Sequence, residues 1–272
     1  MSDVLQHLVE LLALERIEEN LFRGQSQDLG WGQVFGGQVL GQALSAAAKT
    51  VPADRPVHSF HSYFLLTGKV DRPVVYTVDR IRDGGSFTTR RVVAVQDGQP
   101  IFSMSASFQV EESGFEHHDT KPEFPGPDGL PSQVELARKI ADRIPAKLRE
   151  RFTTDGPIEI RPIDPVSPFA PKARPPRQAA WFKARGTLPE VPALHRYLLA
   201  YASDFNFLSA SMNPHGVSWL TPGMQVASLD HAMWFHRPFR MDEWLLQVVE
   251  SPSAAGGRGL VRAHFFTQDG RL

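Results

Sequence analysis

The chain has 272 residues, of which 42% are hydrophobic and 22% are charged, as in ordinary soluble globular proteins. Its formal net charge of −1 gives no general attraction to nucleic acid or to an anionic membrane, so neither is expected as a partner. The sequence has no cysteine, which excludes disulfides, a thiolate nucleophile and a cysteine-based metal site.

The first twenty residues form a charged amphipathic pattern, with leucines at Leu5, Leu8 and Leu12, and lack a secretory hydrophobic segment. No apolar run approaches the roughly 20 residues that a membrane span needs. We therefore expect a cytoplasmic protein.

The first half of the chain predicts one helix followed by four strands. Gly36 and Gly37 open a run of small residues whose apolar spacing predicts a helix, ending near Pro52, that packs closely on a neighbour. Strands are expected at 57–66, 74–81, 87–95 and 101–110. The first has few charges on either face, which indicates burial on both sides. The glycine turns at 83–85 and 96–98 predict hairpins with positive φ.

The second half begins with a linker at 111–131, rich in acidic residues, glycine and proline. A helix is expected at 134–152, and six prolines between 162 and 176 exclude a central strand there. A strand at 179–184 and a helix at 194–212 follow. The remaining strands are expected at 224–235, 244–249 and 260–267.

Two stretches indicate an internal duplication. Ser-Phe-His at 59–61 stands where Ser-Leu-Asp stands at 228–230, and Gln-Asp-Gly at 96–98 returns at 268–270. Each copy follows a helix with small residues, so the pattern is α+β, one helix with an antiparallel sheet, used twice. After the first Gln-Asp-Gly comes an eleven-residue strand, whereas only Arg271 and Leu272 follow the second. A last strand is therefore expected beyond Leu272.

The chain resembles the acyl-CoA thioesterase II family over nearly its whole length. The matching stretches are Val-Phe-Gly-Gly-Gln at 34–38, His-Ser-Phe-His-Ser-Tyr-Phe at 58–64, Arg-Asp-Gly-Gly-Ser-Phe at 82–87, Gly-Leu-Pro-Ser at 129–132, Tyr-Ala-Ser-Asp at 201–204 and Asp-His-Ala-Met-Trp-Phe-His-Arg-Pro at 230–238. The resemblance implies a double hotdog that hydrolyses fatty acyl-CoA to fatty acid and CoA without a cofactor. It implies an N-terminal hotdog at 1–111, a linker with a helix at 112–156 and a C-terminal hotdog at 157–272. A homo-oligomer, dimer or tetramer, is also expected.

The resemblance assigns the catalytic residues. It implies Asp204 and Ser228, together with a glutamine on the strand expected beyond Leu272. The residues add support of their own, because an aspartate among apolar neighbours in the expected helix 194–212 is costly without a partner or a role. A structural aspartate bonded to a loop is the alternative. The expected reaction is direct attack by a water, without an acyl-enzyme.

The first repeat predicts the substrate contacts. Counting back from Ser59 as from Ser228 to Asp204 reaches Phe35, so one active site per chain is expected. Backbone N–H groups of Gly36 and Gly37 are candidates to bind the thioester carbonyl, the alternative being close helix–sheet packing. Arg82 and Arg90 are candidates for the CoA phosphates, the alternative being solvated surface charges.

Two other functions stay open. Asn-Pro-His at 213–215 resembles part of a motif of hotdog enoyl-CoA hydratases, and a non-enzymatic acyl-CoA-binding protein is the other alternative. No metal site is expected, because His58 with His61, and His231 with His236, fall on opposite faces of their strands.

Overall fold

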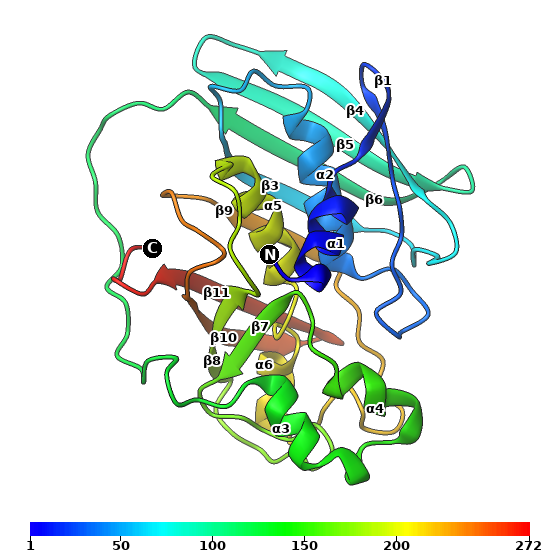
Figure 1. Cartoon of the computed structure of the whole chain (residues 1–272), viewed down its shortest axis with the longest axis vertical. Helices are drawn as coiled ribbons and strands as arrows, with labels where there is room; N and C mark the ends of the chain where they lie inside the picture. Colours follow the sequence, from blue (N-terminus) through cyan, green and yellow to red (C-terminus); the bar gives the residue numbers. More distant parts are fainter.

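The computed structural model describes residues 1–272. Helices α2 (Gly36–Ala48) and α5 (Pro192–Ser203) pack against each other and lie between two antiparallel sheets (Figure 1). The larger sheet has the strand order β1-β2-β4-β5-β6-β3-β9 and the smaller has the order β11-β10-β8-β7. No helix is both long and apolar enough to cross a membrane.

The elements of the first half follow the predicted order closely. Besides α2 they are α1 (Asp3–Leu12), β1 (Glu15–Glu18), β2 (Leu21–Gly24), β3 (Val57–Phe64), β4 (Val74–Asp83), β5 (Phe87–Gln96) and β6 (Gln99–Gln109). The Gln-Asp-Gly hairpin has the expected positive φ at Asp97 and Gly98, 51° and 73°. Gly84 and Gly85 do not, so that prediction was wrong for the other turn.

The second half is more broken than predicted. Its elements are α3 (Gln133–Lys139), η1 (Ala141–Arg143), α4 (Ala146–Thr153), β7 (Ile158–Pro162), β8 (Arg177–Ala184), α5, α6 (Ser209–Met212), η2 (Asn213–His215), β9 (Asp230–Trp234), β10 (Leu245–Ala255) and β11 (Arg258–Thr267). The expected helix 134–152 is divided before α4 because Pro145 cannot continue a helix. The expected helix 194–212 ends at Ser203, and the expected strand 224–235 is only β9.

The duplication is confirmed and reaches further upstream than the matching motifs. In the larger sheet β1, β2, β4 and β5 are neighbours in that order, as β7, β8, β10 and β11 are in the smaller sheet. Helix α2 follows β2 in the chain, as α5 follows β8. The repeat therefore begins with a pair of strands before the helix, which share no recognisable residues.

Strands β3 and β9 join the two repeats. Both follow the central helix of their repeat, and they pair with each other antiparallel. The register puts Ser62 opposite His231, and these two residues hold equivalent positions, each three after the matched serine. The pairing is therefore symmetric about Ser62 and His231, like a contact on the two-fold axis of a dimer. The outer face of β3 is exposed at His61 and Tyr63 in the single chain, so the expected burial on both sides is not met within one chain.

Glycines let the two central helices approach closely. A Cβ atom placed on Gly37 would lie 2.2 Å from the backbone oxygen of Tyr201 on α5, and one on Gly41 would lie 3.1 Å from that of Tyr197. Only glycine fits where another backbone comes so near. The predicted close packing of α2 is thus confirmed, with α5 as the main neighbour.

Candidate active site

Asp204 lies at the C-terminal end of α5, as its C-cap residue, and not in the middle of a helix as predicted. Its carboxyl group faces the start of α2, where it accepts a hydrogen bond from the backbone N–H of Gly37. The N-cap residue of α2, Phe35, makes no side-chain cap bond, and the first turn of α2 has no acidic residue. The carboxylate of Asp204 therefore takes the place of a cap and meets the positive end of the α2 dipole.

The surroundings raise the pKa of Asp204 to about 7, mainly because burial disfavours the charged carboxylate. Hydrogen bonds from Gly37 and from Ser228 act in the opposite direction and are the smaller effect. The neighbouring ring of Phe35 stacks on Phe205 at 4.4 Å and meets Tyr201 edge-on at 5.3 Å, which keeps the site apolar. A carboxyl group with this pKa accepts and returns a proton near neutral pH.

Ser228 stands beside Asp204, as predicted from their pairing. Its Oγ donates to Oδ1 of Asp204 at 3.4 Å, a long hydrogen bond. Ser228 precedes β9 instead of lying within a strand, and it is half-buried. The next residue is fixed, because the carbonyl of Leu229 accepts from the backbone N–H of Phe64 at 3.0 Å.

The turn after Asp204 is held by side-chain amides that the sequence analysis did not identify. Asn206 has a left-handed backbone, with φ of 60°, and its carbonyl accepts from the side chain of Gln178 on β8. Gln178 in turn accepts from Ser209 at 2.9 Å, and the fully buried Gln247 on β10 contacts Asn206 at 3.5 Å. The sequence signal that could have revealed this role is Gln247, a polar residue at an inward-facing position of an expected strand.

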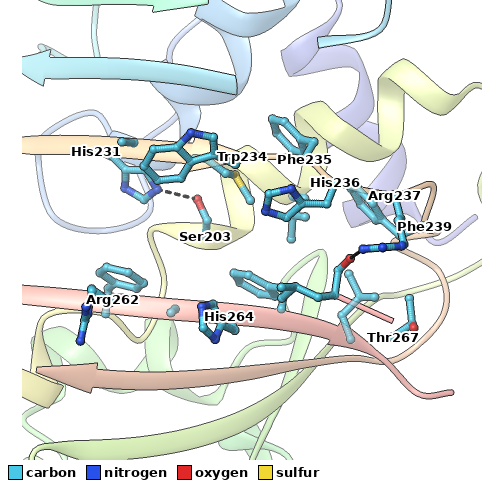
Figure 2. A pocket seen from close by; sticks show the side chains of 18 of the residues that line it. Ser203, His231, Trp234, Phe235, His236, Arg237, Phe239, Arg262, His264 and Thr267 are labelled. Carbon is cyan, nitrogen blue, oxygen red and sulfur yellow. Dashed lines mark hydrogen bonds between the residues drawn. The ribbon is translucent and has the colours of Figure 1, made fainter. Parts of the chain in front are cut away.

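A groove of about 450 Å³ lies next to this pair but contains neither Asp204 nor Ser228. Figure 2 shows His231, Trp234 and His236 on its β9 side and Arg262, His264 and Thr267 on its β11 side. Both strands lie at the ends of their sheets, so their peptide groups along this groove are unpaired. In the first repeat β6 fills the corresponding position between β5 and β3. The groove therefore corresponds to the place that β6 occupies in the first repeat. It is not the proposed site of thioester hydrolysis.

Comparison with known proteins identifies the family. A family profile described as acyl-CoA thioesterase N-terminal domain matches residues 26–109, and one described as acyl-CoA thioesterase matches residues 147–272. Acyl-CoA thioesterase 2 of Haemophilus influenzae is 44% identical over all of this chain and 95% of its own length. The chain belongs to the acyl-CoA thioesterase family.

Solved structures agree with this family assignment. A crystal structure of an acyl-CoA thioesterase II, TesB2, from Mycobacterium marinum is 41% identical with a TM-score of 0.77, covering 97% of this chain and 93% of that one. A protein with a hot dog fold from Alicyclobacillus acidocaldarius is 20% identical with a TM-score of 0.77, covering 98% and 94%. The predicted α+β double hotdog is confirmed, and neither alternative function is favoured.

In this member of the thioesterase family, the glycines at the start of α2 serve Asp204. A Cβ on Gly36 would lie 2.7 Å from Oδ2 of Asp204, so the glycine is needed for the carboxyl group to approach. The N–H of Gly37 also acts on this carboxyl group and lowers the pKa of Asp204. The expected role of Gly36 and Gly37 in binding the thioester carbonyl stays a prediction. The expected close packing is present on both sides of α2. Gly37 and Gly41 lie against α5, and a Cβ on Gly36 would also lie 3.0 Å from the ring of Phe64 on β3.

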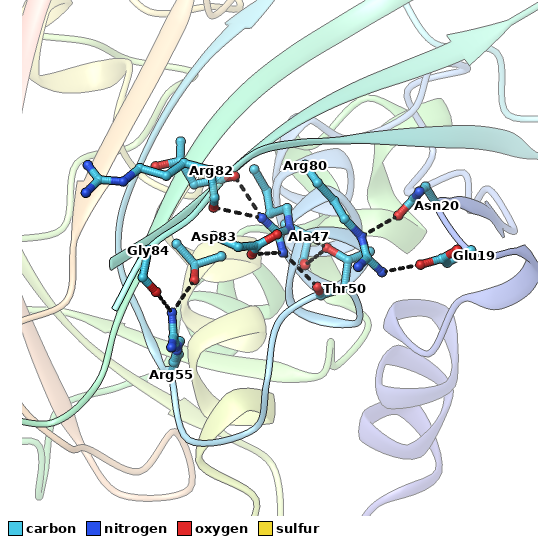
Figure 3. A network of polar contacts seen from close by, with 12 residues as sticks. Glu19, Asn20, Ala47, Thr50, Arg55, Arg80, Arg82, Asp83 and Gly84 are labelled. Carbon is cyan, nitrogen blue, oxygen red and sulfur yellow. Dashed lines mark hydrogen bonds and ion pairs between the residues drawn. The ribbon is translucent and has the colours of Figure 1, made fainter. Parts of the chain in front are cut away.

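Arg90 does not fit the predicted role in binding CoA phosphates. It is 1% exposed, and its guanidinium donates to Thr50, to the carbonyls of Arg82 and Thr89, and to Asp83. Thr50 and Asp83 both lie in the middle of the network drawn in Figure 3. With all its donors used inside the protein, Arg90 ties the β4–β5 hairpin to the end of α2. The side chain of Arg82 is exposed and extends away from the network.

The count back from Ser59, which predicted a single site per chain, does not match the positions of the helices. It put Phe35 in the first repeat opposite Asp204, but Phe35 precedes α2 whereas Asp204 ends α5. The residue at the C-terminal end of α2 is Lys49, which is exposed. The count failed because α6, η2 and a long loop separate α5 from β9, and a much shorter loop separates α2 from β3.

Proposed function

We propose that this protein hydrolyses acyl-CoA thioesters to free acid and CoA, with Asp204 as the general base. The observation that carries the proposal is the desolvated carboxyl group of Asp204, with a pKa near 7, beside the hydroxyl of Ser228. Membership of the acyl-CoA thioesterase family supports the substrate class. The proposed substrates are fatty acyl-CoA thioesters.

In the proposed mechanism a water molecule lies beside Asp204 and Ser228 and forms a hydrogen bond with each. Asp204 takes a proton from the water as the water oxygen attacks the thioester carbonyl carbon, and Ser228 orients the water by a hydrogen bond. The tetrahedral intermediate then breaks its C–S bond, and the proton on Asp204 passes to the CoA thiolate. The long Ser228–Asp204 contact supports this arrangement, because both groups keep capacity to bond a water. The glutamine that the resemblance implies, beyond Leu272, is retained in the proposal as a third group.

The test of the proposed base is Asp204→Asn, assayed by release of CoA thiol from acyl-CoA. Loss of a general base lowers turnover by about 100-fold or more, so we expect a fall of that size in kcat. The neutral amide avoids burying a charge, so above pH 7 the Tm of the variant should equal or exceed that of the parent, which serves as the folding control. Near-normal turnover in a folded variant would refute the assignment of Asp204.

We also propose that the protein forms a homo-oligomer through the outer face of β3 and β9. Large apolar side chains are exposed there, with Tyr63 62%, Trp234 56% and Leu229 55% accessible. Apolar patches of this kind mark protein contacts. The patch lies across the local two-fold axis at Ser62 and His231, which favours a second copy of the same chain as the partner.

The cytoplasmic location expected from the sequence is retained as part of the proposal. For CoA recognition we retain Arg82, whose side chain is exposed and forms no ion pair that would compete with a phosphate. Arginine binds phosphate oxygens through charge-assisted, often paired hydrogen bonds.

A further inference from the structure

His231 is a buried histidine of β9 that the proposed mechanism does not use. His231 is 9% exposed, and the centroid of its ring lies 6.1 Å from that of Phe60 and 5.8 Å from that of Phe207. Nε2 of the ring faces the Oγ of Ser203 at 3.1 Å, as Figure 2 shows. Polar groups buried among aromatic rings are normally hydrogen-bonded, and this contact lies next to the proposed catalytic pair.

The donor in this contact follows from the bonds of Ser203. The hydroxyl of Ser203 donates to the carbonyl of Ala200 at 2.9 Å, so its only proton is used. With that proton on the shorter bond, we assign to His231 the tautomer in which Nε2 carries a proton and donates to Ser203. Burial lowers the pKa of His231 to about 4, which keeps the ring neutral at neutral pH, with one proton to place.

The two partners belong to the two segments that hold the proposed catalytic residues. Ser203 is the last residue of α5, directly before Asp204, and His231 follows Ser228 by three residues. His231 is itself fixed, because its carbonyl accepts from Ser62 Oγ at 2.7 Å on the local two-fold axis. The bond between His231 and Ser203 therefore connects the end of α5 to β9 beside the 3.4 Å contact of Asp204 with Ser228.

The other bonds around Asp204 do not make this connection. Gln178 and Gln247 hold the following turn to β8 and β10, and Gly37 belongs to α2. None of the three reaches β9, the strand that Ser228 precedes. Besides the long direct contact of Ser228 with Asp204, the His231–Ser203 bond is thus a second and shorter side-chain link between the two segments of the proposed pair.

We propose that His231 is a positioning residue, which fixes the end of α5 against β9 through Ser203 and so holds Asp204 at its working distance from Ser228. This inference rests on the proposed function. His231 acts through Ser203 and does not touch the reacting atoms.

The experiment compares His231→Leu, His231→Gln and Ser203→Ala in the thiol-release assay. Leucine removes the donor, whereas the amide of glutamine keeps one near Nε2. We expect His231→Leu and Ser203→Ala each to lower kcat about 10-fold with KM within about twofold, as for loss of alignment without loss of substrate binding. The double variant should be no worse than either single one, and His231→Gln should recover most of the rate.

Two readouts separate positioning from a general structural role. The low-pH limb of kcat/KM should move in His231→Leu, because the surroundings of Asp204 change, whereas partial unfolding would leave its midpoint in place. In an Asp204→Asn background His231→Leu should have no further effect on kcat. Ser203→Ala removes one atom, so it serves if the histidine variants fail to fold.

The inference is overturned if folded His231→Leu and Ser203→Ala turn over at wild-type rates. It is also overturned if glutamine is no better than leucine and both rates simply follow Tm. Failure of the proposed function is a separate result, since Asp204→Asn would then stay active. An inactive Asp204→Asn with fully active His231→Leu would reject only the positioning role.

Discussion

Asp204 is held between opposing electrostatic influences. The C-terminal end of α5 and burial disfavour its charge, while the start of α2 and Ser228 favour it, and the net effect raises its pKa to about 7. A carboxyl group whose folded pKa exceeds its ordinary value of 3.8 prefers to be protonated in the folded state. Its ionisation therefore lowers stability as the pH rises between these two values. This loss of folding stability accompanies a pKa that suits the proposed base to neutral pH.

The pH dependence of hydrolysis should follow that carboxyl group. The base is active when deprotonated, so kcat/KM should be half-maximal near pH 7 and fall about tenfold for each lower pH unit. A stopped thiol assay over about pH 5 to 9 measures this limb. Asp204→Asn should abolish the limb together with most of the activity. A flat profile below pH 7 would contradict the assignment of the base.

Arg82 offers a test of CoA recognition. If its guanidinium binds a CoA phosphate, Arg82→Ala should raise KM about 10-fold and leave kcat within twofold, because that contact is the same in the ground and transition states. Arg16 is also exposed but lies on β1, and Arg16→Ala is the matched control. Equal KM values for the two variants would exclude Arg82 from binding.

At the scale of elements, the contact between α2 and α5 is what brings Asp204 to the start of α2. Gly36, Gly37 and Gly41 all lie on the α2 side of this contact. The small-residue run predicted a close neighbour, but sequence spacing does not identify the neighbour. The structure identifies the neighbour as α5, because the backbone oxygens of Tyr197 and Tyr201 occupy the space that Cβ atoms on α2 would need.

Gly37→Ala should destabilise the protein strongly. The added methyl would stand 2.2 Å from the Tyr201 oxygen, so the helices must separate, at a cost of about 1–3 kcal/mol or more in the free energy of unfolding. Gly85→Ala is the control, because its site is open and its φ is not positive, and it should change stability by less than about 0.5 kcal/mol. Urea unfolding measures both. Equal free energies of unfolding for the two variants would show that the contact between α2 and α5 adjusts to the added methyl group.

Element ends were the weakest part of the prediction, and the active site depends on one of them. Hydrophobic spacing continues from Leu194 to Met212, so it gives no sign that α5 ends at Ser203. The chain leaves the helix because Asn206 adopts a left-handed conformation that Gln178 stabilises from a distant strand. Local pattern cannot reveal such a tertiary contact. The predicted pairing of Asp204 with Ser228 still matches a contact in the structure, because the family resemblance does not depend on helix ends.

At the scale of the whole molecule, turns revealed the duplication more readily than strands. The Gln-Asp-Gly turns keep their residues because positive φ at Asp97, Gly98 and Gly270 restricts the choice. β1 and β2 correspond to β7 and β8 in the sheets without shared residues, since many sequences satisfy a strand. Arg90 was misassigned for a related reason, because sequence alone does not tell a buried guanidinium from an exposed one.

The proposed assembly can be tested on the exposed face of β3 and β9. Trp234→Arg should move the protein to a smaller species in size-exclusion chromatography with light scattering, because a charge would then lie in the apolar contact. Ile17 on β1 is exposed to a similar degree, and Ile17→Arg should leave the assembly unchanged. A wild-type protein that is monomeric at micromolar concentration would rule out the proposed contact.

The local two-fold axis at Ser62 and His231 means that the fold offers every position twice. The place equivalent to Asp204 holds Lys49, and the helix start that would face it begins with Pro192, which has no N–H to donate. That second place therefore lacks both the carboxyl group and the N–H donor found at Asp204 and Gly37. Under the proposed function, joining two copies in one chain allows one half to carry the catalytic residues while the other half is free to change. A symmetric dimer of identical chains cannot make that distinction.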